Sequence, residues 1–183
     1  MSSSKYQSYV RKLTNLKEIH KTMKFYSSNL KALQSSGKGD KIYIVVGSDK
    51  GLCGSYNSKI KQKLKELPPQ SKVVAIGKKL FNYMAEKKFN TIFTLTNIDK
   101  LDLYNVAYSL ADQLKILPLS SISFVYMKYI NGIRQDIVIE DIFQDSQIQE
   151  WTGEKEGNIE DVSSYLYLYS KIFRVLMDGK TCE

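Results

Sequence analysis

Residues Lys41 to Ser58 constrain the fold most, because a short apolar run leads directly into a glycine-rich loop and a helix start. Ile42 to Val46 is continuously apolar, which is typical of a parallel strand buried on both faces. Three glycines then interrupt regular structure: Gly47, Gly51 and Gly54. Three polar residues offer N-cap side chains to a lysine-rich helix: Ser55, Asn57 and Ser58. Strand, glycine loop and helix predict the first βα unit of a nucleotide-binding-like domain.

The glycine loop is the first place to look for chemistry, because backbone N–H groups at a helix start can bind phosphate. A Walker loop needs a Gly-Lys-Ser/Thr triplet, whereas this chain has Gly51-Leu52-Cys53 with Lys50 ahead of the glycine. The glycine spacing also departs from the dinucleotide-binding pattern. Two interpretations remain open: a small nucleotide-dependent enzyme, and a tight turn that lets the helix pack closely on the sheet.

Strands and helices continue to alternate after this loop. The expected elements are a helix over Ser58 to Leu67, a strand over Val73 to Ile76, a helix over Lys78 to Lys88, a strand over Thr91 to Thr96, and a helix from Leu103 to Leu114 that Pro118 stops. Ser121 to Ile130 and Ile133 to Phe143 then flank Asn131-Gly132, a strong two-residue hairpin signal. The predicted fold class is α/β, a Rossmann-like mostly parallel sheet with an antiparallel edge hairpin.

A helix is also predicted for residues 1–36, which contain neither proline nor glycine. Its apolar residues recur with coiled-coil spacing: Tyr9, Leu16, Ile19, Met23, Tyr26, Leu30 and Leu33. Up to Asp40 the segment carries eight basic residues against two acidic ones. The alternatives are a coiled-coil arm, an amphipathic helix packed on the domain, and a nucleic-acid-binding helix. The aromatic residues lie on the apolar seam instead of between the basic residues, which disfavours nucleic acid.

A second apolar seam lies near the end of the chain, in a helix predicted for Ile159 to Leu176. Its residues are Val162, Leu166, Tyr169, Phe173 and Leu176. Two such helices at opposite ends of the chain can pair as an antiparallel coiled coil. The predicted organisation is therefore an N-terminal coiled-coil helix over 1–36, an α/β domain over 41–148, and a C-terminal coiled-coil helix over 159–183.

Composition excludes several classes of protein. A net charge of +8 favours anionic partners, and only two cysteines among 183 residues argue against a disulfide framework. No apolar stretch reaches the roughly 20 residues that span a bilayer, and no signal-peptide core is evident. The acidic stretch Asp141 to Asp161 has no nearby nucleophile, and the sole histidine, His20, has no cluster with which to share a metal. We therefore expect no catalytic residues, no cofactor and no metal.

The stretch Ser48 to Asn57 resembles the signature of the gamma subunit of F-type ATP synthases. That family has a Ser/Thr-Asp-Arg-Gly-Leu-Cys-Gly-Gly run, followed by an aromatic residue or leucine and then asparagine. Here Lys50 stands in place of the arginine and Ser55 in place of the second glycine of the pair.

Both terminal helices resemble the same family. The N-terminal helix matches its pattern at Asn15, Ile19, Lys21, Met23, Lys24, Ser27 and Ser28, and departs from it at Leu16, Glu18, His20, Thr22 and Phe25. Tyr167 to Tyr169 and Phe173 to Met177 resemble the start of the family's C-terminal helix. Because the chain stops at Glu183, we expect a divergent member that lacks the distal C-terminal helix.

The resemblance implies a non-catalytic central-stalk rotor that couples rotation to ATP synthesis or hydrolysis in a surrounding ring. The matched motifs place contacts to that ring at Lys21, Met23, Lys24, Lys50, Gly51, Leu52, Cys53 and Gly54. The implied partners are the alpha and beta subunits of the catalytic ring, an epsilon-type stalk subunit and the membrane c-ring, with no nucleic acid. The expected location is the cytoplasmic face of the inner membrane, or the mitochondrial matrix side, with membrane contact only through the complex. A gamma-like shaft of a divergent ATPase that drives other mechanical work is an alternative, as is the small nucleotide-binding enzyme.

Overall fold

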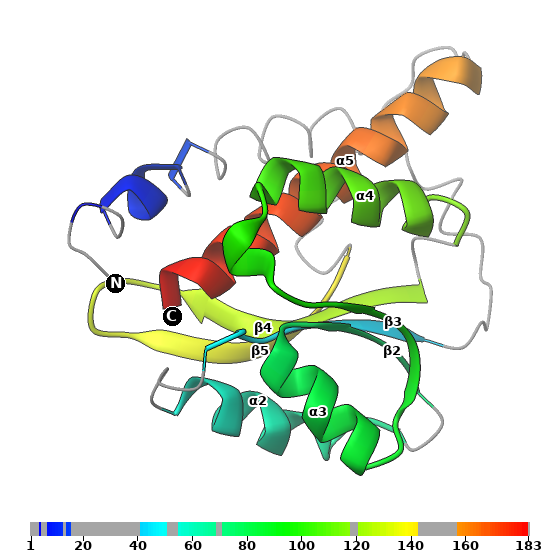
Figure 1. Cartoon of the computed structure of the whole chain (residues 1–183). Coiled ribbons are helices and arrows are strands. Elements are labelled where there is room, and N and C mark those ends of the chain that lie inside the picture. The colour runs from blue at the N-terminus through cyan, green and yellow to red at the C-terminus, as the bar shows by residue number, and fades with distance from the viewer. Residues whose placement is uncertain are drawn as a thin grey trace.

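A five-stranded sheet with the order β3-β2-β1-β4-β5 forms the centre of the protein (Figure 1). The structure is a computed structural model that describes residues 4, 7–12, 14–15, 41–50, 55–68, 71–117, 121–142 and 157–182. The strands are β1 (Ile42–Val46), β2 (Lys72–Ile76), β3 (Asn90–Leu95), β4 (Ile122–Tyr129) and β5 (Gln135–Asp141). The first four are parallel, and β5 pairs with β4 in the antiparallel sense. The predicted fold class is confirmed.

Strand β1 lies in the middle of the sheet, and all five of its residues are buried. It pairs with β2 through Val46 opposite Ile76, and with β4 through Ile44 opposite Phe124. Both faces of the strand contribute to hydrophobic clusters, because successive side chains point to opposite sides of the sheet. The continuous apolar run in the sequence is thus explained by burial on both faces.

Helices cover both faces of the sheet. Figure 1 shows α2 (Tyr56–Leu64) and α3 (Lys78–Glu86) on one face, and α4 (Leu103–Leu114) and α5 (Gly157–Cys182) on the other. The chain changes faces after β3, because α4 leads from that edge back across β1 to β4. Each pair of helices completes a separate hydrophobic cluster.

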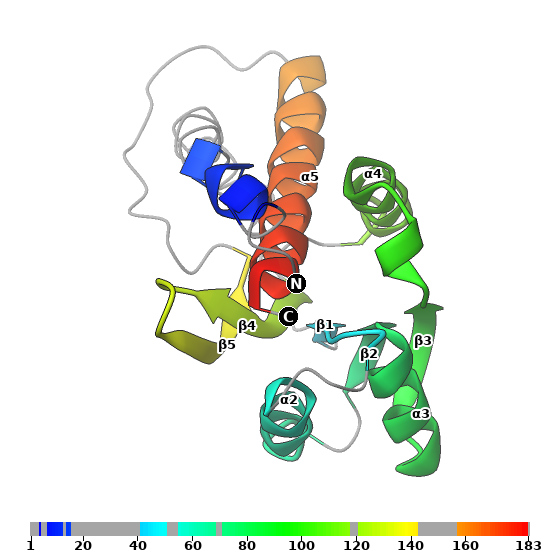
Figure 2. The same cartoon turned by 60° about the vertical axis from the view of Figure 1, so that its left-hand side comes forward.

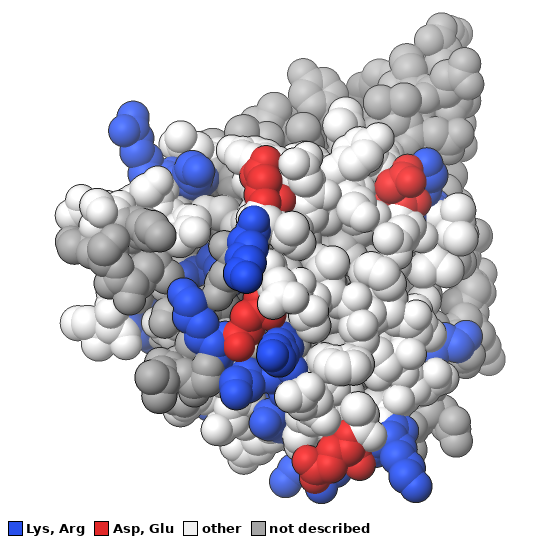
Figure 3. Space-filling view, viewed as in Figure 1, with Lys and Arg blue, Asp and Glu red and all other residues white. Residues whose placement is uncertain are grey.

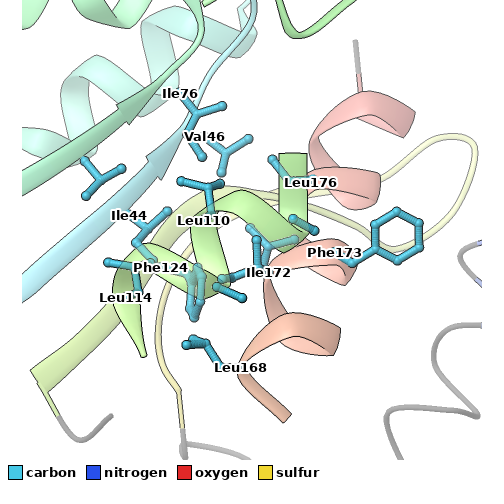
Figure 4. Close-up of a cluster of buried hydrophobic side chains, with 14 of the residues drawn as sticks. Ile44, Val46, Ile76, Leu110, Leu114, Phe124, Leu168, Ile172, Phe173 and Leu176 are labelled. Carbon is cyan, nitrogen blue, oxygen red and sulfur yellow. The ribbon is translucent and has the colours of Figure 1, made fainter. Parts of the chain in front are cut away.

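Helix α5 is part of the main hydrophobic core. Its side chains Leu168, Ile172 and Leu176 pack with Leu110 and Leu114 of α4 over the sheet (Figure 4). From Tyr167 to Cys182, every α5 residue except Tyr169 is buried. Within the seam that the sequence predicts, Leu166 is instead 40% exposed. The helix continues beyond Leu176, where the predicted apolar seam ends, through Gly179 to Cys182.

Two local predictions are wrong. The β4–β5 hairpin exists, but its connection comprises residues 130–134 instead of two residues. The Asn131 side chain accepts hydrogen bonds from the backbone N–H groups of Ile133 and Arg134, which stabilises the longer turn. At the start of α2, Ser55 occupies the N-cap position without a side-chain capping hydrogen bond.

The described N-terminal residues lie beside α5 (Figure 1, Figure 2). Residues 7–12 are helical, and Tyr9 packs against the cluster that contains α5. Most of the predicted N-terminal seam, within residues 16–40, lies outside the described residues, as do Phe143 and the acidic stretch around Trp151. None of the helices among the described residues is long and apolar enough to cross a membrane.

Candidate functional site

The structure describes one of the eight predicted site residues, Lys50. It lies exposed in the loop after β1, at the carboxyl edge of the sheet. The other seven lie outside the described residues: Lys21, Met23, Lys24, Gly51, Leu52, Cys53 and Gly54. The described part of the candidate site therefore consists of the residues that flank the glycine loop and of the strands and helices next to them.

The polar residues on either side of the glycine loop bind each other. The backbone N–H of Ser48 donates to Asn57 Oδ1 at 3.2 Å, and Asn57 Nδ2 donates to Ser48 Oγ at 2.7 Å. Ser48 Oγ in turn donates to the carbonyl of Lys50 at 2.8 Å. Asn57, expected as an N-cap, instead joins the first turn of α2 to the end of β1. These two motif residues thus fix where the loop leaves the sheet and where it returns.

Asp49 joins the carboxyl ends of three strands. Its Oδ1 accepts hydrogen bonds from the backbone N–H groups of Lys78, at the start of α3, and Asn97, after β3, each at 2.9 Å. A carboxylate at a helix N-terminus is stabilised by the helix dipole and satisfies an otherwise unpaired N–H. The anion-binding position at the start of α3 is therefore already occupied by a side chain of this protein.

Two glycines allow β1 and α3 to approach closely. A Cβ at Gly47 would lie 2.4 Å from Leu80 Cγ, so no side chain fits there. Gly77 has a φ of 103°, and a Cβ on it would lie 2.8 Å from the backbone carbon of Gly47. The tight-turn interpretation explains Gly47 fully, without any ligand.

The C-terminal end of α5 lies over the carboxyl ends of β1 and β4. Asp178 Oδ1 accepts a hydrogen bond from the Tyr129 N–H at 3.1 Å, and Cys182 Sγ donates to the Met127 carbonyl at 3.6 Å. A Cβ on Gly179 would lie 3.0 Å from both Val46 Cγ1 and Tyr56 Oη, so the helix backbone itself touches this edge. Figure 2 shows the end of α5 against these two strands.

This edge is where open α/β sheets usually bind ligands. The helices attached to β1 and β4 lie on opposite faces, which makes the space between these strands a topological switch point. In this protein α5 fills that position, and Cys182 even reaches the hydrophobic cluster on the α2–α3 face. The structure thus closes the crevice in which a nucleotide of a Rossmann-like enzyme would sit.

A buried ion cluster, which the sequence did not reveal, lies between α5 and the sheet. Glu140 of β5 accepts hydrogen bonds from Lys171 Nζ, from Arg174 Nη2 at 3.1 Å, and from the Tyr126 hydroxyl of β4 at 2.5 Å. Lys171 is fully buried, and Glu140 is 4% exposed. We call these four residues the Glu140 cluster.

The charges of the Glu140 cluster depend on one another. Burial alone would raise the pKa of Glu140, but the hydrogen-bonded Lys171 ammonium, the Tyr126 hydroxyl and the Arg174 guanidinium hold that pKa at about 2. Burial and the Glu140 carboxylate raise the pKa of Tyr126, so its hydroxyl stays protonated and donates. One sequence signal for the cluster existed: Glu140 shares a strand face with Val138, and Lys171 and Arg174 interrupt an apolar stretch of helix.

The surface charge is unevenly distributed. Figure 3 shows lysine and arginine side chains gathered over the left and lower parts of one face, while its right-hand half is largely uncharged. Lys78 and Lys79, at the start of α3, are both exposed. Within the described ranges, no group of three or more His, Cys, Asp or Glu side chains is arranged to hold a metal ion.

Comparison with protein families gives one match over the whole chain. The family model described as ATP synthase matches residues 1–183. The ATP synthase gamma chain of Mycoplasmopsis synoviae is 33% identical over 167 residues, which cover 78% of this chain and 56% of that protein. The gamma chain of Clostridium novyi is 25% identical over 167 residues, covering 82% of this chain and 58% of its own length. The chain thus spans a little over half the length of these curated relatives.

Solved structures show the same fold. A chain of the central stalk and c-ring structure of Tetrahymena thermophila mitochondrial ATP synthase superposes with a TM-score of 0.67 at 18% identity, covering 98% of this chain and 89% of the other. A chain of the Euglena gracilis mitochondrial ATP synthase rotor gives a TM-score of 0.62 at 14% identity, covering 99% and 87%. At these identities the likeness concerns the fold.

Proposed function

The chain belongs to the ATP synthase gamma-chain family, and from this premise we propose that it is a non-catalytic central-stalk subunit that turns inside a catalytic ring. The observation that carries the proposal is the position of α5. Its second half is buried in the core of the α/β domain, and its end fills the switch point where a nucleotide would bind. The domain is therefore built to hold a helix, and among its described residues α5 takes the place of a substrate at that edge.

The first turns of α5 extend beyond the sheet (Figure 1, Figure 2). A helix that is held firmly at one end and projects at the other suits a shaft that carries motion between two bodies. In this proposal the projecting end and residues 1–36 enter the ring of alpha and beta subunits. An epsilon-type subunit and a c-ring bind the α/β domain, and the membrane is reached only through them.

The contacts to the ring in this proposal are Lys21, Met23, Lys24, Lys50, Gly51, Leu52, Cys53 and Gly54. Support comes from the loop that holds five of them, because the hydrogen bonds of Ser48 and Asp49 fix its first residues at the edge of the sheet. Lys50 is exposed there, beside the exposed lysines at the start of α3. Cations at such an edge favour contact with acidic surfaces of neighbouring subunits.

Purification of the complex from the cell tests the proposal. The chain should be tagged at its N-terminus and purified from its source at low ionic strength, and the proteins that accompany it should be identified. We expect alpha- and beta-type subunits in fixed ratio, together with ATP hydrolysis by the complex. A gamma-like shaft coupled to other mechanical work would bring ring subunits without a c-ring.

The isolated chain provides a second test. Because α5 occupies the switch point, equilibrium dialysis with labelled ATP should detect no binding to the 183-residue chain. Saturable binding of ATP by a chain that purifies without ring subunits would contradict the proposal and support the nucleotide-dependent enzyme.

A further inference from the structure

We infer that the Glu140 cluster is the joint that fixes the axial position of α5 on the sheet, so that the helix and the α/β domain turn as one body. The fixed position is a property of the chain itself. Its consequence for torque rests on the proposed function.

The apolar face of α5 does not by itself fix the position of the helix along the sheet. Leu168, Ile172 and Leu176 recur every four residues and pack on the same cluster. A slip of the helix by four residues, about 6 Å at 1.5 Å per residue, would place one of these side chains where the previous one had been. Branched apolar side chains of similar size replace one another at small cost. These three side chains therefore tolerate such a slip, although Gly179 opposes one direction of it, because Val175 would come to the place where even a Cβ would lie 3.0 Å from Val46 Cγ1.

The buried charges do not tolerate it in either direction. A slip one way brings Asp178 to the place of Arg174, where its carboxylate would face the carboxylate of Glu140. A slip the other way brings Tyr167 to the place of Lys171 and Ser170 to the place of Arg174, and Glu140 loses both of these cations. Lys128 of β4 would stay 3.8 Å from the Glu140 carboxylate, but its side chain is 34% exposed, and a buried carboxylate that loses its two hydrogen-bonded cations is strongly unfavourable. The cluster thus opposes a slip in both directions, which the repeated contacts of Leu168, Ile172 and Leu176 alone would allow.

Two further hydrogen bonds join α5 to the sheet when the helix is in this axial position. The Tyr167 hydroxyl donates to the Ile142 carbonyl at 2.7 Å near the start of β4, and Asp178 accepts from Tyr129 N–H at its end. The Glu140 cluster lies between these two and is the part that carries buried charge. In other proteins, buried polar groups likewise fix the register of packed helices, at some cost in stability.

The consequence for a rotor is mechanical. Torque that arrives at the projecting end of α5 reaches the α/β domain only if the helix neither slides nor rolls on the sheet. If apolar contacts alone held α5, load could move the helix along the sheet by about one helical turn. The charges of the Glu140 cluster are paired at one position of the helix, so the cluster resists that movement.

The test replaces the cluster by apolar residues and measures the position of the helix. The variant Glu140→Leu/Lys171→Met/Arg174→Met removes all three charges, and buried ion pairs replaced by apolar residues of similar volume often keep their stability. Spin labels at Leu166→Cys and Ile133→Cys, in a background of Cys53→Ser and Cys182→Ala, report the distance between α5 and the hairpin. Both labelled side chains are exposed, at 40% and 101%.

With the cluster intact we expect one narrow distance. In the apolar variant we expect a second population, shifted by about 6 Å, which is one slip of four residues at 1.5 Å each. The control Asp112→Asn/Lys115→Gln removes an ion pair whose side chains are about half exposed, and it should leave the distance unchanged. A folded apolar variant with one unshifted distance would overturn the inference.

Should the apolar variant fail to fold, Glu140→Gln/Lys171→Met/Arg174→Met serves in its place, because it also removes all three charges but keeps the shape of the Glu140 side chain and an acceptor for the Tyr126 hydroxyl. The same second population is expected, and a single unshifted distance again overturns the inference. In the assembled ATPase, the variant that slips should pump fewer ions per ATP hydrolysed. Full coupling despite a slipped helix would overturn the mechanical part. A chain that slips as expected but never assembles with a ring would refute the proposed function and leave the joint standing.

Discussion

The two faces of the sheet solve the same packing problem in different ways. On the α2–α3 face, charged side chains remain in water, and ion pairs such as Lys63 with Glu66 and Lys87 with Glu86 are exposed. On the α4–α5 face, aromatic rings stack along the helices, as Tyr104 does on Phe173 at 4.4 Å, and charges enter the core at Glu140. Exposed pairs contribute little to stability, whereas buried charges are costly unless fully paired. Among the described residues, the buried charged side chains all lie on β5 and α5, on the face where α5 packs.

The largest expected effect comes from single substitutions that test this contrast between buried and exposed ion pairs. Glu140→Leu removes the carboxylate that Lys171 and Arg174 share, and it should lower the free energy of unfolding by about 3–5 kcal/mol. Its counterpart on the other face, Glu66→Gln, removes an exposed partner of Lys63 and should cost about 0–1 kcal/mol. Urea denaturation of both variants measures the difference. Equal losses would remove the distinction between the faces.

Acid should weaken the α4–α5 face selectively. The pKa of Glu140 is held at about 2 in the folded chain, below its ordinary 4.5, so the unfolded chain binds more protons between these values. The stabilisation is therefore fully present above about pH 4.5 and is lost as the pH falls towards 2. A shift of this size corresponds to a loss on the order of 3 kcal/mol.

The fully apolar variant of the Glu140 cluster is the control for this acid effect, because it has no carboxylate at this site. Denaturation across this pH range should therefore give a flatter profile for that variant than for the unmodified chain. Two parallel profiles would show that Glu140 does not cause the acid sensitivity.

Replacing one glycine on each face should change stability less, and it compares how tightly the two faces are packed. Gly47→Ala would place a Cβ 2.4 Å from Leu80 on the α2–α3 face, and this overpacking should cost about 1–3 kcal/mol. Gly179→Ala at the end of α5 makes contacts no closer than 3.0 Å, and alanine gains about 1 kcal/mol of helix propensity. The shift in melting temperature should therefore be clear for the first and near zero for the second. The reverse order would show that the end of α5 is the tighter contact.

The smallest effect concerns the edge that joins the two faces. Asp49→Ala removes the acceptor for two backbone N–H groups, of Lys78 and Asn97, and should cost about 1–2 kcal/mol. Hydrogen exchange at those two amides should speed up more than at the buried amides of β1. Unchanged exchange at both amides would show that water replaces the carboxylate without loss.

The order of strands and helices is predictable from the sequence, because each rests on a local pattern. The apolar run at β1 and the alternation that follows determine a parallel sheet, and Asn131-Gly132 marks the hairpin. The length of that turn is not predictable from the dipeptide, because the Asn131 side chain binds the backbone two and three residues ahead. The same holds for the N-cap of α2, since Asn57 binds Ser48 nine residues earlier.

The site is less predictable than the fold. Sequence similarity marks the glycine loop as a motif, but only the structure shows that Gly47, Ser48, Asp49 and Asn57 support the turn itself. The Glu140 cluster joins residues 31 and 34 positions apart, so charges within apolar stretches indicate burial but do not identify which residues pair. An acidic residue at the end of an exposed-looking strand is normally a solvated one, so its burial emerges only when α5 is packed in place.

Rotation of the chain inside its complex tests the central claim most directly. A bead attached through Ile133→Cys, which is fully exposed at the hairpin, follows the α/β domain while the ring is fixed to glass. If the chain is a shaft whose helix and domain move together, addition of ATP should turn the bead in one direction, and the rate should follow ATP hydrolysis. A bead that stays still while the ring hydrolyses ATP at its normal rate would contradict the account.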